Sequence, residues 1–337
     1  MKTAVIGLGR MGQRHLQVAE SLELQIVGIC DQNLDTLLSS ANAFNIPNNQ
    51  QFSNIRDLFS QTSPECVIIA TTAPSHCEYT CLAAQSGAAY VLCEKPMGIS
   101  LAECDRMIQT CDKHHTRLAI NHQMRFIEQY TRAKHIINQE SFGKLTSITI
   151  VAGNMGFAMN GLHYFEMFRF LTDENPSEIT AWFSQVKVPN PRGAHYEDRA
   201  GSLRALTPSG KRLYLEMSAD QGHGVNLIYA GTYGQLISDE LLGTLHLSTR
   251  KPEQRIHPTT RYAQPAISEK LSFQPIDVIA ATRSVLEALF IGEDYPTAQE
   301  ARQAISVLLA AYISEEEHHR SVKLDDNLPR DRTFPWA

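Results

Sequence analysis

Three glycines, Gly7, Gly9 and Gly12, follow directly on an apolar run near the start of the chain. The run Thr3 to Gly7 has the composition of a short buried strand, and a helical pattern begins after the glycines. A second apolar run, Leu24 to Cys30, completes a β-α-β unit. A glycine-rich turn in this position is typical of dinucleotide-binding units. The feature therefore predicts an N-terminal Rossmann domain.

Each glycine has a physical role in such a turn. Gly7 permits the tight turn, Gly9 lets the backbone approach a pyrophosphate, and Gly12 allows close packing of helix on strand. Arg10 and Met11 lie in the first helical turn, where unpaired N–H groups and the helix dipole favour an anion. A cluster of turn glycines without a ligand is the alternative.

Asp31 stands at the end of the second predicted strand, about twenty residues beyond the glycines. A carboxylate there accepts hydrogen bonds from the adenosine ribose hydroxyls and repels a 2′-phosphate. Gln32 and Asn33 follow it, so no arginine stands beside it to hold such a phosphate. The position predicts NAD rather than NADP, although an Asp capping the next helix fits it as well.

The strand and helix alternation continues as far as Arg117 to Ile120, which predicts an α/β domain with a doubly wound parallel sheet. Beyond it, strand-like segments, among them Glu178 to Val188, are joined by hairpin-type turns such as Pro208-Ser209-Gly210. These predict a C-terminal α+β domain on a large open, mainly antiparallel sheet, with a long loop over 247–273. We expect an NAD-binding domain over 1–122, and a domain for substrate binding and oligomerisation over 123–337.

Composition narrows the class of protein. The 337 residues carry a formal net charge of -6 with no cluster of Lys and Arg, which disfavours nucleic acid as a partner. No apolar run has membrane-spanning length and no leader pattern is visible, so we expect a cytoplasmic protein without membrane contact. The seven cysteines, an odd number without a CxxC pair, are expected to be reduced thiols, and no metal site is predicted.

Three further segments make the chain resemble the Gfo/Idh/MocA oxidoreductases, the family of glucose-fructose oxidoreductase and inositol dehydrogenase. They are Ala70-Thr71-Thr72-Ala73-Pro74-Ser75-His76, Glu94-Lys95-Pro96 and His122-Gln123-Met124-Arg125-Phe126. The resemblance continues through Phe142-Gly143-Lys144-Leu145, Ala230 to Leu236 and Ala310 to Ser314, so it spans almost the whole chain.

The resemblance implies roles for residues in these segments. In addition to the glycine loop and Asp31, it places six more residues around the dinucleotide. They are Thr71, Thr72, Pro74, His76, Glu94 and Lys95. Lys95 is implied to lie near the nicotinamide. A lysine in a partly desolvated cleft is usable as a proton shuttle near neutral pH, so Lys95 is the first catalytic candidate. The substrate contacts predicted are His122, Arg125 and Asn160.

His163 is the second catalytic candidate, since its segment resembles the helix on which the family carries a His followed three residues later by an acid, here Glu166. Imidazole suits a general base at neutral pH. Many sugar dehydrogenases of the family carry an Asp four residues before this His, where the present chain has Met159. Asn160 lies on roughly the same helix face, but its amide cannot take a proton.

These observations predict an NAD(P)-dependent dehydrogenase acting on CH–OH groups. It would transfer a hydride between NAD and a secondary hydroxyl or carbonyl of a sugar, sugar nucleotide or cyclitol. Two alternatives stay open. One is a non-catalytic NAD-binding sensor or regulator, since the resemblance reaches the yeast galactose-pathway repressor. The other is a reductase of a non-sugar carbonyl or imine. A small-molecule substrate and a homodimer or homotetramer are expected.

Overall fold

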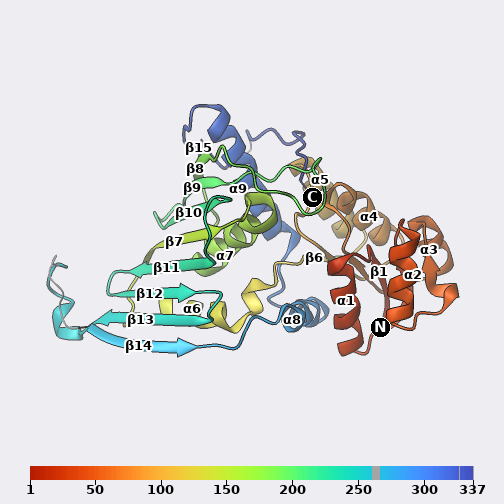
Figure 1. Ribbon diagram of the computed structural model, residues 1–337, viewed down its shortest axis with the longest axis horizontal. Coiled ribbons are helices and arrows are strands. Elements are labelled where there is room, and N and C mark those ends of the chain that lie inside the picture. Colours follow the sequence, from red (N-terminus) through yellow and green to blue (C-terminus); the bar gives the residue numbers. More distant parts are fainter. Residues whose placement is uncertain (260–265, 326, 337) are drawn as a thin grey trace.

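The protein is described by a computed structural model over residues 1–259, 266–325 and 327–336. Two separate sheets organise it, a six-stranded parallel sheet at the N-terminal side and a nine-stranded, mainly antiparallel sheet (Figure 1). The predicted fold class is confirmed.

The N-terminal sheet has the strand order β3-β2-β1-β4-β5-β6, and every pairing in it is parallel. Its inner strands are short and apolar because helices cover both faces. The strands are β1 (Lys2–Ile6), β2 (Gln25–Cys30), β3 (Gln51–Phe52), β4 (Cys66–Ile69), β5 (Tyr90–Cys93) and β6 (Arg117–Ile120). The helices are α1 (Arg10–Ser21), α2 (Leu34–Ala43), α3 (Ile55–Gln61), α4 (Ala73–Gln85) and α5 (Leu101–Lys113).

The second sheet has the strand order β14-β13-β12-β11-β7-β10-β9-β8-β15, and only β7 and β10 run parallel to each other. Its strands are β7 (Leu145–Gly153), β8 (Glu178–Phe183), β9 (Gly201–Leu206), β10 (Arg212–Ser218), β11 (Val225–Gly231), β12 (Gly234–Asp239), β13 (Thr244–Arg250), β14 (Ala266–Ser272) and β15 (Val322–Lys323). Helices α6 (Glu128–Ile137), α7 (Leu162–Thr172) and α9 (Ala298–Glu316) belong to this half (Figure 1).

The two faces of the second sheet differ in cover. Side chains of one face, such as Ile150 and Leu215, are buried in the large hydrophobic core that also contains residues of α7 and α9. Side chains that alternate with them point the other way, and among these Trp182, Tyr214 and Ile237 are exposed. The period of two along each strand therefore produces one packed face and one exposed face.

Several expected elements need correction. The predicted loop over 247–273 contains β14, which pairs with β13, while residues 260–265 lie outside the described part. The strand expected over Glu178 to Val188 ends at Phe183, and residues 184–200 form a long loop. Three consecutive polar residues, Ser268, Glu269 and Lys270, interrupt the apolar pattern in the middle of β14, so the sequence does not show the alternation that is typical of a strand.

A C-terminal helix covers the N-terminal sheet. In α8 (Val278–Ile291) the side chains Val285, Leu286 and Leu289 are buried in one cluster with Val5 of β1 and Ile29 of β2. The chain thus returns to the Rossmann half after completing the second sheet. The domain division at residues 122 and 123 stays a prediction. In the part of the chain that the structure describes, no helix combines the length and apolarity needed to cross a membrane.

Candidate active site

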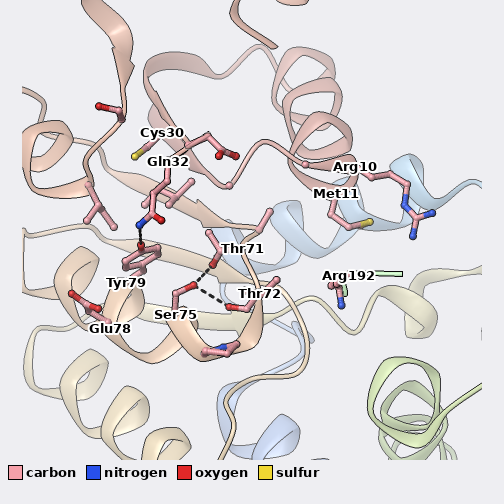
Figure 2. Close-up of a pocket in the computed structure, with 18 of the residues that line it drawn as sticks. Arg10, Met11, Cys30, Gln32, Thr71, Thr72, Ser75, Glu78, Tyr79 and Arg192 are labelled. Atoms are coloured by element: carbon pink, nitrogen blue, oxygen red, sulfur yellow. Dashed lines mark hydrogen bonds between the residues drawn. The ribbon is translucent and has the colours of Figure 1, made fainter. Parts of the chain in front are cut away.

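A cleft of about 960 Å³ runs along the carboxyl ends of the parallel strands. Most of its lining comes from the loops after β1, β2 and β4, and the second sheet's half contributes Met159, Pro191 and Arg192. Figure 2 shows that Glu78, Tyr79 and Gln32 lie at one end of this cleft and Arg10, Met11 and Arg192 at the other. A cleft of this volume is at the upper end of the range for small-molecule and cofactor sites.

The glycine loop has the geometry that its sequence predicts. Gly7 has a φ of +84°, and a Cβ at Gly12 would lie 1.9 Å from the carbonyl oxygen of Gly7. A Cβ at Gly9 would meet nothing within 4 Å, so this side of the loop is open. Gly9 is the N-cap of α1 and no side chain caps the helix. The loop therefore leaves backbone N–H groups available to a phosphate in the cleft.

Asp31 directly follows β2 and lines the cleft. Its Oδ2 accepts a hydrogen bond of 2.8 Å from the N–H of Leu8, and its Oδ1 accepts one of 2.8 Å from the N–H of Asn33. The N-cap of α2 is Asn33, whose side chain accepts from Thr36 N–H, so Asp31 is not the capping residue. These bonds hold the carboxylate against the glycine loop while it lines the cleft.

The predicted residues after β4 divide into two groups. Thr71, Thr72 and Pro74 line the cleft, and Ser75 Oγ donates a hydrogen bond of 2.7 Å to Thr71 Oγ1 (Figure 2). His76 is buried beneath them, with Nδ1 2.7 Å from the carbonyl oxygen of Pro96 and Nε2 3.1 Å from that of Thr71. His76 thus connects the cleft loop after β4 to the segment that follows β5, and burial lowers the pKa of its imidazole.

Glu94 is also buried rather than part of the cleft lining. His15 Nε2 lies 2.8 Å from Glu94 Oε1, and Asn121 Nδ2 donates a hydrogen bond of 2.8 Å to the same oxygen. Burial opposes the charged carboxylate, but the hydrogen bonds and the charge of His15 outweigh it and lower the pKa of Glu94 to about 2. The carboxylate is therefore ionised and joins α1 to the ends of β5 and β6.

Lys95 is half-buried next to this carboxylate, and its Nζ donates a hydrogen bond to the carbonyl oxygen of Met159. Burial lowers the pKa of Lys95 to about 8; Arg192 and Arg10 act in the same direction, and Glu94 acts against it. The amine thus exchanges its proton near neutral pH. Lys95 is not among the residues that line the cleft, but its bond to Met159, which does line it, places the amine where the two halves of the protein meet.

His163 and His122 lie together, with ring centroids 5.5 Å apart and ring planes at 85°. Burial, followed by the charge of Lys95, lowers the pKa of His163 to about 3, and burial also lowers that of His122. Each ring has a buried Nδ1 for which the described part of the chain supplies no hydrogen-bond partner. An imidazole with this pKa is neutral at physiological pH and can donate or accept a hydrogen bond, and the catalytic role of His163 stays a prediction.

Arg125 and Glu166 form part of a buried ion-pair cluster instead of facing the cleft. Arg125 donates hydrogen bonds to Glu166 and, at 2.9 Å, to Glu300. Arg169 completes the cluster, 3.3 Å from Glu166 and 2.7 Å from Glu300. The carboxylate of Glu166 is thus bound to two arginines and does not orient His163. Asn160 is half-buried in the π-helical turn Phe157–Gly161 that precedes α7.

Two residues at this site were absent from the sequence prediction. Asp198 is buried, and its carboxylate accepts hydrogen bonds of 2.8 Å from Ala158 N–H and 3.1 Å from Met159 N–H. Burial raises its pKa to about 6. Arg192 lines the cleft from the same loop over 184–200. The loop is polar and contains two prolines and one glycine, and nothing in its sequence shows that it returns over the Rossmann half.

The loop is tied to the Rossmann half by Tyr196, whose hydroxyl donates a hydrogen bond of 3.2 Å to Thr72 Oγ1. Of the other polar residues in this half, His195 and His223 are exposed and Arg199 is half-buried. The second half of the chain therefore contributes to the cleft through one loop and one π-helical turn.

Comparison with known proteins supports the assignment of the Rossmann half. The Gfo/Idh/MocA family model, an oxidoreductase family with an NAD-binding Rossmann fold, matches residues 1–122. A D-apiose dehydrogenase of Paraburkholderia graminis is 28% identical over 50% of this chain and 49% of its own length. An inositol 2-dehydrogenase of Salmonella typhimurium is 26% identical over 43% of each chain. The matched region thus spans about half the length of these relatives or less.

Solved structures extend the likeness of fold to nearly the whole chain. An Agrobacterium radiobacter oxidoreductase in complex with NAD+, L-tartaric acid and magnesium has a TM-score of 0.80 at 17% identity, covering 96% of this chain and 98% of its own. A super-repressor mutant of Gal80p from Saccharomyces cerevisiae has a TM-score of 0.77 at 14% identity, covering 96% of this chain and 97% of its own. Enzyme and repressor thus share one fold.

Proposed function

We propose that this chain, a member of the Gfo/Idh/MocA oxidoreductases, transfers a hydride between NAD and a secondary hydroxyl or carbonyl of a sugar, sugar nucleotide or cyclitol. The relatives named D-apiose dehydrogenase and inositol 2-dehydrogenase support a polyol substrate. The observation that carries the proposal is Lys95, a half-buried amine with a pKa of about 8 that is bonded to the main chain of Met159, a residue of the cleft lining.

The cleft fits a dinucleotide. The open side of Gly9 and the uncapped start of α1 suit the pyrophosphate, and Thr71 and Thr72 line the path beyond it. When bound, NAD supplies a nicotinamide ring that accepts or donates the hydride. Asp31 supports NAD over NADP because its carboxylate would repel a 2′-phosphate. Arg56, however, lines the cleft too.

The preference for NAD is tested by titrating NADH and NADPH and following protein fluorescence. The wild type should bind NADH more tightly, by roughly tenfold or more, and Asp31→Ala should reduce this difference. An Arg56→Ala variant is the matched control. If it weakens NADPH binding while Asp31→Ala changes neither affinity, Arg56 rather than Asp31 decides the cofactor, and the NAD assignment is wrong.

Lys95 is the group that we propose to move the proton. In the oxidation direction, its neutral amine would accept the hydroxyl proton at Nζ, and in reduction the ammonium would return it. His163, neutral at physiological pH, would hold the reacting hydroxyl by a hydrogen bond, with His122 beside it. Glu94 would act through Lys95, as a buried anion that raises its pKa.

A non-catalytic sensor is the second candidate, and the shared fold with Gal80p is the observation that favours it. A screen of sugars, sugar acids, sugar phosphates and cyclitols, following NADH formation, separates the two. An enzyme should turn over at least one compound, and Lys95→Met should abolish that turnover while NADH binding persists. Tight NADH binding without turnover of any compound would support the sensor.

We also propose that the exposed face of the second sheet forms a homodimer or homotetramer contact. Trp182, Tyr214 and Ile237 are exposed on it, and apolar side chains on an open face favour association. Light scattering should give a mass of two or four chains.

The seven cysteines are free, which suits the reducing environment of a cytoplasm.

A further inference from the structure

The helix that carries His163 begins without a capping side chain from its own segment. The π-helical turn Phe157–Gly161 runs directly into α7, and no side chain caps the turn at Gly156 or the helix at Gly161. Phe157 and the residue after it are buried, so water does not serve their N–H groups. Buried N–H groups at a helix start need acceptors, because each one left unpaired costs free energy. The acceptors of this turn therefore come from elsewhere in the chain.

Asp198 and Arg199 supply these acceptors, from the end of the long loop that precedes β9. The N–H of Phe157 donates a hydrogen bond of 2.8 Å to the carbonyl oxygen of Arg199. The N–H of Ala158 donates one of 2.8 Å to Asp198 Oδ1, and that of Met159 donates one of 3.1 Å to Asp198 Oδ2. Three consecutive N–H groups are thus bonded to two consecutive loop residues, and the Asp198 carboxylate serves as the N-cap of the turn.

The carboxylate of Asp198 fits closely against Gly156. The carboxylate is buried, and a Cβ at Gly156 would lie 2.2 Å from its Cγ, 2.3 Å from Oδ2 and 2.4 Å from Oδ1. The backbone of Gly156 is extended, with φ −112° and ψ 162°, a conformation that any residue adopts. This glycine is therefore required because it leaves room for Asp198, and not because of its own conformation.

Met159 connects Asp198 to Lys95 through its main chain. Its N–H is bonded to Asp198, and its carbonyl oxygen accepts the hydrogen bond of Lys95 Nζ. The main chain of Met159 thus determines where the amine is held, and the side chain of Met159 lines the cleft. Asp198 is not among the residues that line the cleft, so it acts on the site through Met159 and not by contact with the reacting atoms.

We infer that Asp198 is a positioning residue: its carboxylate fixes the π-helical turn and, through the main chain of Met159, holds Lys95 in place for proton transfer. The role rests on the proposed function, in which Lys95 moves the proton. The carboxylate has a second effect, because its negative charge favours the ammonium form of Lys95 and raises the pKa of that lysine. An acid from the long loop thus supports Lys95 in a chain that has no acid at position 159.

Competitive labelling tests this role without requiring turnover. Trace acetylation with acetic anhydride over pH 6–11, followed by mass spectrometry of the lysine peptides, gives a titration midpoint and a limiting rate for each lysine of the intact protein. In Asp198→Ala the limiting rate of Lys95 should rise by about threefold or more, because the turn that holds its amine is released. Lys113, exposed on α5, should keep its rate.

The conservative variant Asp198→Asn keeps the shape of the side chain and one acceptor oxygen, but not the charge. Its limiting rate for Lys95 should stay closer to the wild type than that of Asp198→Ala. The titration midpoint of Lys95 should fall, because the anion that raises its pKa is gone. A merely structural role would leave this midpoint unchanged, and the variant decides the question even where an alanine variant does not fold.

Glu197→Gln is the matched control for the change of charge. It removes one negative charge from the neighbouring position, where Glu197 pairs with Arg199 at 3.5 Å and makes no bond to the turn that an acceptor of the turn would make. Neither the limiting rate nor the midpoint of Lys95 should change in this variant.

Gly156→Ala tests the same contact while the carboxylate is kept. Its methyl would overlap the Asp198 carboxylate, so the limiting rate of Lys95 should rise as it does in Asp198→Ala. Added to Asp198→Ala, the same substitution should change the rate by less than about twofold, because the overlap is then absent. The inference is overturned by an unchanged Lys95 rate in both single alanine variants, an unchanged midpoint in Asp198→Asn, or an equal rise in Glu197→Gln or at Lys113.

Turnover separates this outcome from that of the proposed function. If a compound of the sugar and cyclitol screen is oxidised, Asp198→Ala should lower kcat by about tenfold or more, since a small displacement of the proton acceptor is costly. A change of Lys95 labelling in a protein that oxidises no compound would contradict the dehydrogenase while the inference stands. Turnover by a protein in which Lys95 does not respond to Asp198 would do the reverse.

Discussion

Lys95 Nζ donates its hydrogen bond to the main-chain carbonyl of Met159, a residue 64 positions further along the chain. The bond joins the end of a Rossmann strand to the π-helical turn of the second half. Because the acceptor is a backbone oxygen, the contact does not depend on which side chain stands at position 159. The lysine is therefore held in place although this chain has Met159 where the resemblance to the family's sugar dehydrogenases implies an Asp.

Replacing Lys95 by Met should lower kcat by about 10²–10⁴-fold, the usual contribution of a positioned acid or base. NADH affinity should stay within about threefold, because the glycine loop and Asp31 are untouched. In the wild type, oxidation should accelerate as pH rises through about 8, since the neutral amine is the active form. Steady-state rates over pH 6–10 check this, and a Met variant with the same pH profile and rate would contradict the assignment.

Replacing Glu94 by an uncharged residue should shift the pH profile of the oxidation rate. The anion raises the pKa of Lys95, so Glu94→Gln should lower it and shift the rise of the oxidation rate to lower pH, by up to about one unit. His15→Gln tests the same pair of residues from its other member, on α1, because it removes the imidazole that lies against the Glu94 carboxylate. If Glu94 had a purely structural role, Glu94→Gln would change the oxidation rate or the stability of the protein and leave the midpoint of the pH profile unchanged.

Two alanine substitutions in the glycine loop should separate binding from folding. Gly9→Ala adds a methyl to open space, so its melting temperature should stay within about 2 °C while NADH affinity falls at least tenfold. Gly12→Ala forces a Cβ to 1.9 Å from the Gly7 carbonyl oxygen and should destabilise the fold by roughly 2 kcal/mol or more. Thermal unfolding with and without NADH measures both. A Gly9→Ala protein that binds NADH normally would mean that the pyrophosphate lies elsewhere.

Glu240 should make the protein less stable in mild alkali. Tyr164 donates to both oxygens of Glu240, at 3.1 and 2.9 Å, and burial raises the pKa of Glu240 to about 8. A carboxyl with a raised pKa contributes its full stability below its unfolded value near 4.5, and loses it as pH rises through 8. Glu240→Gln should remove roughly 2–4 kcal/mol of this pH dependence. Urea unfolding at pH 5, 7 and 9 checks the difference, and parallel curves for both proteins would show that Glu240 does not titrate there.

Local order along the chain was enough to determine the Rossmann half. The positions of Gly7, Gly9 and Gly12 between a strand and a helix, and of Asp31 after the next strand, follow from backbone sterics and strand length. Such features act over a few residues, and the structure shows the glycine loop as expected. The alternation of short apolar runs likewise predicted the parallel sheet, because a strand covered on both faces needs apolar side chains throughout.

What only the tertiary structure decided concerns contacts between distant segments. The burial of Glu94 against His15 and Asn121, and the pairing of Arg125 with Glu166 and Glu300, depend on elements brought together by folding. So does the return of the loop over 184–200, which places Arg192 and Asp198 beside Lys95. Desolvation and charge proximity, which set the pKa values of Lys95 and His163, exist only once those segments meet. The residue types were visible in the sequence, but their burial and their neighbours were not.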